Sequence, residues 1–557
     1  SDPLYGTFGD VTDERSHMLT HSGLWARSVR TLALAYSTPA SRYHHSDEIL
    51  QSIAFALKGY GRWVYPGCPK PANWWAWDIG MPMNLVDAYI LLQDSLPVTQ
   101  ADFLRDTLKH LVRTGVQKGL GANAIWVAWI QFRFGMSVDN LDYVQWGYET
   151  LNRQSQISAQ SGDGIKPDYS YHFHAPGMNM GYGVSHYADI SRYLFLTQGT
   201  PYAMQEPSVH VRWYLEYIRW LVFRDADDLY AYGRAGTRTD GKERAAIILE
   251  STLPFVALDS PDHDEIVADC KRLLADVPEF FSLLHASEQL TVEKSRVAPA
   301  VLEGFRYYPY SSCGIWRGRD FMGTVRLDSP RNKKWFSIHN ENLLGHRIAD
   351  GHLPLWVDGF ETAGGVLPCQ DWERLSGITG AAGFVLPRES LGQSTLSGGV
   401  SLENKYGLAA MELIVKPAQD GATLSARKSY LFLPDAAICL VSDACVSPST
   451  AAAVPYTVLA QIPWNLPDKR PGLTLDGKEL PLIEDKEWTQ AFQWLHFRER
   501  GLVNLMPRDI HLTWQTTTSP WSRINQIMAP DREMDRLYTC SFLVAEHVHS
   551  CTDALAY

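Results

Sequence analysis

The sequence predicts an α+β multidomain protein, in which a helical array or toroid over residues 1–297 is followed by an antiparallel β-sandwich domain over residues 298–557. Three observations predict this class. A chain of 557 residues is too long for one compact core. Segments with the helical period recur up to about residue 295, and short β-branched and aromatic segments replace them afterwards.

The helical prediction rests on apolar residues at positions i, i+3, i+4 and i+7, which is the pattern of an amphipathic helix. Short polar or glycine-containing turns separate the segments that show it. Clear examples are residues 46–64, 101–120, 209–225 and 264–284. Several helices in series without strands between them are typical of an array or toroid built from helical hairpins.

Beyond residue 298 the segments are short, rich in β-branched and aromatic residues, and separated by Gly, Pro, Asn and Asp. Clear examples are residues 304–318, 321–329, 408–417, 423–446 and 535–547. This pattern is typical of antiparallel strands in stacked sheets. The stretch VEKSRVAPAVLEG, residues 292–304, is the natural boundary between the two parts.

Composition limits the classes of partner. The net charge of -12 argues against nucleic acid, because phosphate binding needs a cationic surface. No segment is long and apolar enough to span a membrane, so no membrane partner is expected. An acidic polysaccharide is compatible with the charge, since a few local arginines can dominate one cleft of an acidic protein. The 19 Trp and 26 Tyr indicate either large cores or flat rings that stack on sugars.

The eight cysteines are spread along the chain without a CxxC pair, so we expect no zinc site, and their even number permits disulfides without demanding them. The opening residues, SDPLYG, lack the basic and apolar regions of a signal peptide, which fits a mature secreted protein or a cytosolic one. We expect a monomer that requires no cofactor, and a structural calcium ion in the β domain stays an open alternative.

Four short segments have a composition that is unusual for pure packing. They are NWWAWDIGMP (73–82), GLGANAIW (119–126), PDYSYHFHAPGMNMGYG (167–183) and YGRAGTRTD (232–240). Each has an ordinary alternative, in which the tryptophans are buried, the asparagine caps a helix and the arginines are solvated. Together they supply an amide, a histidine, a tyrosine, two arginines and an aromatic platform, which is a set suited to a ligand site.

In order and approximate spacing, these segments resemble the helical domain of polysaccharide lyase family 8. The β half continues the likeness. FSIHNENLLGHRIADGHLPLW (336–356) is similar to the family's S-I-x-x-E-N…DG element, and QDWERLSGIT (370–379) is similar to its W-x-x-LPGTT segment. The resemblance covers roughly residues 60 to 380. The chain is shorter than many members, which predicts that a terminal β module is missing.

The resemblance implies an incomplete (α/α) toroid that leads into antiparallel β-sheets, in agreement with the pattern of the segments. It also implies a reaction, β-elimination at a uronic acid residue, in which the C5 proton is removed, the O4 glycosidic bond breaks and an unsaturated C4–C5 product forms without water. Members act on hyaluronan, chondroitin, xanthan and polyuronates such as alginate and glucuronan. Polymer substrates imply secretion.

The resemblance also implies the catalytic residues. Asn123 of GAN donates its side-chain NH₂ group to the substrate carboxylate, whose negative charge grows as the C5 proton leaves. His174, the second histidine of YHFH, assists at the carboxylate or at C5. Tyr182 of GYG acts as base and then as acid toward the leaving oxygen, and Arg234 favours its phenolate form. One tyrosine serves both transfers because H5 and O4 lie on the same face of a β-linked glucuronate or mannuronate.

The same segments supply the substrate-binding residues. Arg238 is expected to bind an adjacent substrate carboxylate bidentately, and Gly181 and Gly183 allow the backbone to come close. His172 is the rival of His174 for the catalytic role. The other candidates are Asn73, Trp74, Trp75, His339, Asn340, Glu341 and Asn342.

Two features depart from the glycosaminoglycan-cleaving members of the family. Their gap between histidine and tyrosine is one residue longer, so Tyr182 is identified by its Tyr-Gly pair. Phe336 stands where they place a catalytic glutamate just before Ser-Ile, and His339 replaces an asparagine-type residue, which puts the support of the arginine pair in question. A site with fewer acidic side chains is better suited to a polymer in which every sugar carries a carboxylate, because fewer like charges repel it. This favours a homopolyuronate, polymannuronate or glucuronan, over hyaluronan, chondroitin or xanthan.

Two other classes of protein stay open. Helical toroids also host glycoside hydrolases, which use two carboxylates, and Asp163 and Asp168 lie near the histidine motif. A non-catalytic carbohydrate-binding protein is the second. His339, His346 and His352 are either structural or bind a metal between the domains, although their spacing matches no recognised ligand set.

Overall fold

A computed structural model describes residues 22–69, 74–115, 121–159, 161–238, 242–258, 260–283, 286–417, 421–448, 453–464, 472–484, 486–527 and 534–557. The chain packs as two compact units. The first consists of Ser1–Gln156 together with Leu196–Glu206, and the second of Ile157–Phe195 together with Pro207–Tyr557.

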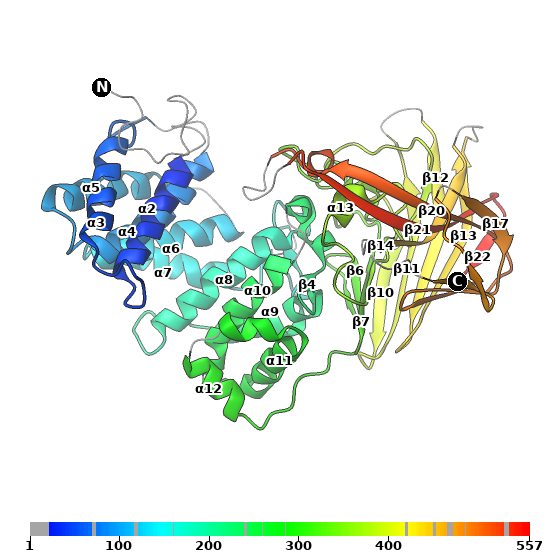
Figure 1. Cartoon of the computed structure of the whole chain (residues 1–557), viewed down its shortest axis with the longest axis horizontal. Coiled ribbons are helices and arrows are strands. Elements are labelled where there is room, and N and C mark those ends of the chain that lie inside the picture. Colours follow the sequence, from blue (N-terminus) through cyan, green and yellow to red (C-terminus); the bar gives the residue numbers. More distant parts are fainter. Residues whose placement is uncertain are drawn as a thin grey trace. The chain divides into compact units, whose positions relative to one another are not determined.

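The described part of the first unit is helical (Figure 1, blue to cyan). Ser46 accepts a hydrogen bond from the Ile49 N–H at the start of α3, and Asn140 caps α7 by accepting from the Tyr143 N–H at 3.1 Å. Helix α6 is buried on nearly every face, so it forms the centre of the unit. The helices are α2 (Ser22–Ser37), α3 (Asp47–Tyr60), the π-helical turn η2 (Ala76–Gly80), α4 (Met81–Leu92), α5 (Val98–Gly115), α6 (Gly121–Ser137) and α7 (Leu141–Gln154).

The second unit begins with helices and two short hairpins. The hairpin strands are β1 (Gly164–Ile165), β2 (Tyr171–His172), β3 (Val222–Phe223) and β4 (Ala226–Asp227). The α-helices are α8 (Met180–Thr197), α9 (Pro207–Glu216), α10 (Lys242–Thr252), α11 (His263–Asp276) and α12 (Ala286–Lys294), and the 3-10 segments are η3 (Ile218–Leu221), η4 (Leu229–Thr237), η5 (Leu253–Ala257) and η6 (Pro278–Leu283).

The rest of the second unit is built from antiparallel sheets, of which the described residues form four larger ones. The first is β5 (Gly304–Tyr308), β6 (Cys313–Gly318), β7 (Phe321–Arg326) and β8 (Leu355–Trp356). The second is β10 (Ser397–Leu402), β11 (Tyr406–Val415), β12 (Thr423–Phe432), β13 (Ala437–Ser447) and β22 (Ala554–Ala556). The third is β17 (Glu487–Ala491), β20 (Asp509–Pro520), β21 (Leu537–Val548), β14 (Pro455–Trp464) and β9 (Thr379–Ala381). The fourth is β16 (Lys478–Leu480), β15 (Leu473–Leu475), β18 (Trp494–Phe497) and β19 (Arg500–Val503).

One apolar core connects these sheets. Along β11 every second residue is buried, so Met411 and Leu413 point inward, as the period of a half-buried strand requires. They share the core with Leu424 of β12, Leu512 of β20 and Leu543 of β21. Short helical turns lie between the strands: η7 (Gly345–Arg347), α13 (Val366–Cys369) and η8 (Trp521–Arg523).

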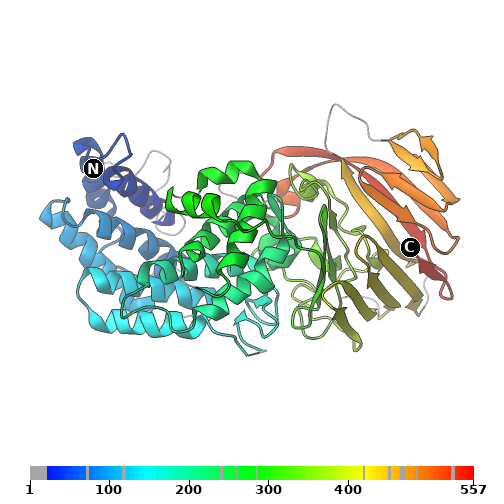
Figure 2. The ribbon, with the colours of Figure 1, turned by 90° about the horizontal axis from the view of Figure 1, so that it is seen from below.

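Helices give way to strands where the sequence predicts it, since α12 ends at Lys294 and β5 begins at Gly304. The predicted class, a helical N-terminal part followed by antiparallel sheets, is confirmed. Packing divides the chain at a different place, because α8 up to Phe195 and helices α9 to α12 belong to the same unit as the sheets (Figure 2, cyan-green to green). Hydrogen bonds link these helices to the sheets. For example, Tyr308 of β5 donates its hydroxyl to the carbonyl of Glu216 in α9 at 2.6 Å.

None of the helices in the described ranges combines the length and the apolar character needed to cross a membrane.

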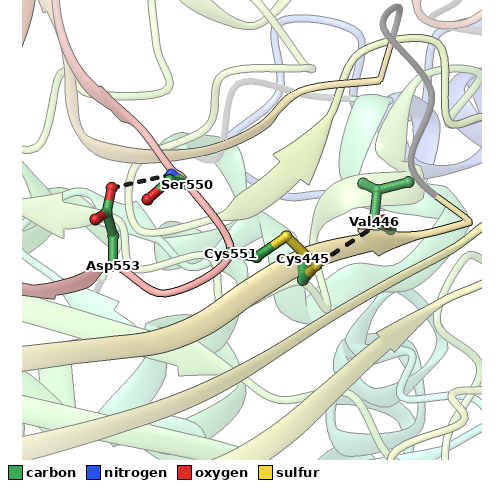
Figure 3. The surroundings of a disulfide bond; sticks show 5 residues. All are labelled: Cys445, Val446, Ser550, Cys551 and Asp553. Atoms are coloured by element: carbon green, nitrogen blue, oxygen red, sulfur yellow. Dashed lines mark hydrogen bonds between the residues drawn. A yellow bond between two sulfur atoms is a disulfide. The ribbon is translucent and has the colours of Figure 1, made fainter.

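A disulfide joins Cys445 of β13 to Cys551, which lies just before β22 (Figure 3). The two residues are 106 positions apart in the sequence, so the bond closes a long loop. It holds the end of the chain where β22 pairs with β13, for example Leu440 with Ala556. The remaining cysteine side chains are buried.

We expect Cys551→Ser to lower the free energy of unfolding by about 4 kcal/mol, because a disulfide that closes a long loop restricts the unfolded chain. Urea unfolding followed by tryptophan fluorescence measures the change. As a control, a reducing agent should destabilise the parent to the same extent and leave the variant unchanged. A variant as stable as the oxidised parent would contradict this role.

Candidate active site

His174 lies at the tip of a loop between β2 and α8. The two sides of this loop are hydrogen bonded, since the Phe173 N–H donates to the Gly177 carbonyl at 3.0 Å and the Asn179 N–H donates to the Tyr171 carbonyl at 3.1 Å. His174 is exposed and has a φ of 56°, in the left-handed region. The loop therefore presents the His174 ring outward while its base stays anchored.

Two glycines bring α8 and η4 together. A Cβ atom added to Gly181, in the first turn of α8, would lie 2.4 Å from the Ala235 Cβ of η4. A Cβ atom added to Gly233, where φ is 57°, would lie 2.8 Å from the Met178 carbonyl oxygen. Only glycine allows such an approach. Tyr182 and Arg234 each directly follow one of these glycines, so the close packing brings their side chains within reach of each other.

Arg234 connects Tyr182 to a buried carboxylate. One Nη atom of Arg234 donates to the Tyr182 hydroxyl at 2.6 Å, and the other donates to Glu341 Oε2 at 2.7 Å. Arg238 grips the same carboxylate with two bonds, from Nε at 2.6 Å and from Nη2 at 3.0 Å. The Glu341 side chain is only 1% exposed. The Tyr182 oxygen therefore lies beside the positive charge of Arg234, and Glu341 fixes the orientation of that guanidinium.

Aromatic rings surround the tyrosine. The Phe173 ring stacks on the Tyr182 ring with 3.9 Å between centres, and the His174 ring stands edge-on to Tyr182 at 6.0 Å. His174 also contacts the Phe336 ring, with 5.8 Å between centres. Partial desolvation and the Arg234 charge lower the pKa of His174 below its ordinary value. At neutral pH the ring is therefore neutral, with one donor and one acceptor nitrogen.

Glu341 supplies the support of the arginine pair that the sequence left in question. The sequence raised the question because Phe336 stands at the position of the family's glutamate, and it assigned Glu341 to substrate binding. The contacts of Glu341 do not support that assignment, because both of its carboxylate oxygens are taken by the two arginines and the residue is buried. The bidentate grip of Arg238 is likewise made with Glu341, although its side chain stays 35% exposed and can offer further donors to a substrate.

His172 and Asn342 are buried, and their contacts are with other groups of the protein. His172 is 2% exposed, its Nε2 lies 3.0 Å from Ser311 Oγ, and burial lowers its pKa to about 3. The Asn342 N–H donates to Thr237 Oγ1 at 3.1 Å, and its side-chain amide donates to the Phe336 carbonyl at 3.2 Å. Their positions do not support the predicted substrate contacts. His174 is the accessible histidine of the motif.

His339 and Asn340 occupy the two central positions of a tight turn. Both have a positive φ, 55° and 58°, and the Glu341 N–H donates to the Ile338 carbonyl at 3.2 Å, which is the pattern of a type I′ turn. Both residues are exposed. The turn therefore buries Glu341 and presents the two preceding side chains at the surface, where their predicted role in substrate binding is sterically open.

The remaining candidates belong to the first unit. Asn123 is the third residue of α6, so it stands inside the helix and is not its cap. It is 9% exposed, and its Oδ1 has no hydrogen-bond partner among the described residues. Trp75 is 40% exposed and packs edge-on against Trp126 with 5.6 Å between ring centres, while Trp74 is half-buried. Asn73 lies outside the described residues.

Two of the three histidines that could have formed a metal site, His346 and His352, are held by protein groups. His346 Nε2 lies 2.7 Å from Glu373 Oε1, and His352 Nδ1 lies 2.9 Å from the Ser376 carbonyl. Across the described ranges, no three His, Cys, Asp or Glu side chains form a group suited to a metal ion. The structural alternative for these histidines is therefore the one that the contacts support.

The carboxylates of the hydrolase alternative also have structural partners. Asp163 Oδ1 accepts from the Ala175 N–H at 2.9 Å. Asp168 accepts from the N–H and the hydroxyl of Ser170 and, at 2.8 Å, from the Tyr310 N–H. Both carboxylates therefore hold the loop that carries His174 or anchor it to the β part.

Sequence reasoning missed two contacts of the site. Phe173 stacks on Tyr182. In the sequence it lies between two candidate histidines and was not itself a candidate. Lys333 places its ammonium Nζ 4.3 Å from the centre of the Phe336 ring, and it lies just before the motif that was recognised. The signal available in the sequence was Phe336, an aromatic residue where an acid was expected, because an aromatic ring attracts a cation.

Two family models match the chain. "Polysaccharide lyase family 8, N terminal alpha-helical domain" matches residues 10–218, and "Polysaccharide lyase family 8, super-sandwich domain" matches residues 303–557.

Curated relatives include the chondroitinase-AC of Pedobacter heparinus, 24% identical over 74% of this chain and 55% of the relative, and the xanthan lyase of Bacillus sp., 24% identical over 83% and 49%. The chain thus spans about half the length of these two. A hyaluronate lyase of Thermasporomyces composti is 24% identical over 93% of this chain and 68% of the relative.

Solved structures are similar over nearly the whole chain. The Paenibacillus xanthan lyase has a TM-score of 0.87 at 20% identity, covering 96% of this chain and 53% of its own. The chondroitin AC lyase of Streptomyces coelicolor has a TM-score of 0.80 at 16% identity, covering 99% and 80%. These similarities show the fold, which is the predicted toroid followed by antiparallel sheets.

Glu341→Gln should lower the free energy of unfolding by about 3 kcal/mol, because it leaves the buried Arg234 guanidinium without its negative partner. Urea unfolding measures the loss. The matched control is Glu389→Gln, which removes a carboxylate that is 39% exposed, and it should change stability by less than about 1 kcal/mol. Equal effects of the two substitutions would contradict the role of Glu341.

Proposed function

Because the chain belongs to polysaccharide lyase family 8, we propose that it is a polysaccharide lyase that cleaves a β-linked uronic-acid polymer by syn β-elimination. The observation that carries the proposal is the 2.6 Å hydrogen bond between Arg234 and the Tyr182 hydroxyl. This contact places a positive charge on the oxygen that takes the proton, which is where a base at this position needs it.

In this mechanism Tyr182 removes the proton from C5 of the uronate and then gives a proton to O4 of the departing sugar. The two transfers use one group because H5 and O4 lie on the same face of the ring. Arg234 stabilises the phenolate, and Glu341 keeps the guanidinium in place. His174, neutral at neutral pH, donates to the substrate at its carboxylate or near C5.

Asn123 is assigned to the substrate carboxylate. Removal of the C5 proton spreads negative charge onto this group, and the side-chain NH₂ of an asparagine donates two hydrogen bonds to it. Asn123 lies in the first turn of α6 and is 9% exposed, and its NH₂ group is the donor that this motif offers for the role. Trp74 and Trp75 are assigned to stacking on sugars, and the exposure of Trp75 supports this.

The preferred substrate in our proposal is a homopolyuronate, polymannuronate or glucuronan. The acid that a glycosaminoglycan-cleaving member would carry at position 336 is absent, and the charge of Glu341 is compensated by two arginines. Such a site repels a polymer with a carboxylate on every sugar less than a site with the additional acid would. Hyaluronan, chondroitin and xanthan are the alternatives, since relatives carry the names of lyases for these polymers.

A glycoside hydrolase and a non-catalytic binding protein are the alternatives of other classes. Hydrolysis requires two carboxyl groups that flank the scissile bond, whereas Asp163 and Asp168 already accept hydrogen bonds from the loop backbone. A binding protein has no need for a guanidinium on a tyrosine oxygen. The geometry therefore favours the lyase.

We also propose that the protein is secreted and monomeric. The disulfide between Cys445 and Cys551 supports an oxidising compartment. A polymeric substrate, which does not enter cells, fits the same location.

A panel of polymannuronate, glucuronan, hyaluronan, chondroitin and xanthan should separate the substrates and the classes of reaction. The lyase is expected to raise ultraviolet absorbance, because it forms a conjugated unsaturated acid, and to do so fastest on a homopolyuronate. New reducing ends without added absorbance would indicate a hydrolase. Absorbance that rises fastest on hyaluronan or chondroitin would contradict the substrate preference.

Tyr182→Phe and Asn123→Ala should each lower kcat by about 10³-fold or more, because each removes a group that acts on the developing charge or on the proton. Initial rates of absorbance increase measure this, and circular dichroism checks the fold. Tyr406→Phe, in β11, is the matched control and should keep the parent's rate. Substantial activity in Tyr182→Phe would mean that another residue is the base.

A further inference from the structure

Lys333 lies beside the candidate active site and has no part in the chemistry described so far. Its ammonium Nζ is 4.3 Å from the centre of the Phe336 ring. Phe336 contacts His174 at 5.8 Å between ring centres, and His174 contacts Tyr182 at 6.0 Å. The rings of Phe336 and His174 therefore form a continuous set of contacts between the Lys333 ammonium and Tyr182.

Phe336 and the loop of His174 hold Lys333 in place. The face of an aromatic ring attracts a cation, and the Phe336 ring is buried, with room left for it by Gly233, where an added Cβ would lie 3.0 Å from Phe336 Cδ1. The Lys333 N–H donates to the Pro176 carbonyl at 2.8 Å. A glutamate at position 336 would pair with the ammonium, whereas phenylalanine leaves its charge uncompensated from that side.

The ion pair with Glu389 shows that a carboxylate can bind the Lys333 ammonium. Its Oε2 lies 3.2 Å from Lys333 Nζ, and the Glu389 side chain is 39% exposed. The Glu389 end of this pair reaches water, whereas the Lys333 side chain is only 14% exposed, so water screens the pair from the Glu389 side. An incoming carboxylate can take the place of Glu389 from this side, because it supplies the same charge to the ammonium.

We propose that Lys333 binds a second carboxylate of the polymer, on a uronate next to the one that reacts, with Glu389 as its exchangeable counter-ion. The inference rests on the proposed function and names the feature that makes a homopolyuronate the better substrate. Consecutive uronates supply a carboxylate at this place. A polymer in which an uncharged sugar separates the uronates does not.

The test measures the Kd of a glucuronate tetrasaccharide and of a mannuronate tetrasaccharide by calorimetry, in the full chain carrying Tyr182→Phe so that neither is cleaved. Lys333→Gln should raise the Kd of the better-bound one about 10-fold, the loss expected for one charge-assisted hydrogen bond. Lys333→Arg should keep most of the affinity. Lys405→Gln is the matched control, since Lys405 also faces an aromatic ring, Tyr406, at 5.4 Å, and it should change nothing.

Glu389→Gln should act in the opposite direction and lower the Kd about 2- to 5-fold, because it removes the group that competes for Lys333. In the double variant with Lys333→Gln this gain should disappear. A gain that persists without Lys333 would show a general effect of charge and overturn the proposal. So would an unchanged Kd in Lys333→Gln, or a loss of affinity in both single variants, as expected if the ion pair were merely structural.

Turnover separates this inference from the proposed function. If the parent binds a tetrasaccharide through Lys333 but forms no unsaturated product, the lyase assignment fails and the binding site stands. If the parent forms the product and Lys333→Gln has the parent's KM, the lyase assignment stands and the binding site fails. Absence of binding to both tetrasaccharides also overturns the inference.

Discussion

The candidate site depends on one buried carboxylate that compensates two guanidinium groups. Glu341 accepts hydrogen bonds from both Arg234 and Arg238 while almost fully removed from water. Burial of a charge is tolerated only when an opposite charge and hydrogen bonds replace the lost water. The same bonds that satisfy Glu341 fix the direction of the Arg234 fork, and that direction is toward the Tyr182 oxygen. Stability and function thus rest on the same contacts.

The three members of this arrangement come from separate segments of the second unit. Tyr182 is in the first turn of α8, Arg234 is in η4, and Glu341 ends a tight turn of the β part. Thr237 joins the last two, because its hydroxyl accepts from the Asn342 N–H and its carbonyl accepts from the Trp521 indole at 2.7 Å. The helices and sheets of this unit therefore meet at the site, and its geometry depends on that packing.

Periodicity was enough to predict the fold class, because the alternation along β11 and the helical period of α11 are local properties. His174, Tyr182 and Arg234 were found through short motifs, and they lie together. The role of Glu341 was not predictable from its neighbours, since an acid in SIHNEN looks like a surface residue until the fold buries it between two arginines. Local patterns also miss that packing divides the chain near residue 156, while composition changes near 298.

The most direct measurement is a crystal structure of the Tyr182→Phe variant with a uronate tetrasaccharide bound. We expect one uronate with H5 and O4 on the face turned toward the ring of residue 182, its carboxylate on the Asn123 amide, and Arg234 still paired with Glu341. A scissile bond that lies between two carboxylates would contradict this mechanism. So would a C5 atom that faces His174 while the ring of residue 182 points away from the sugar.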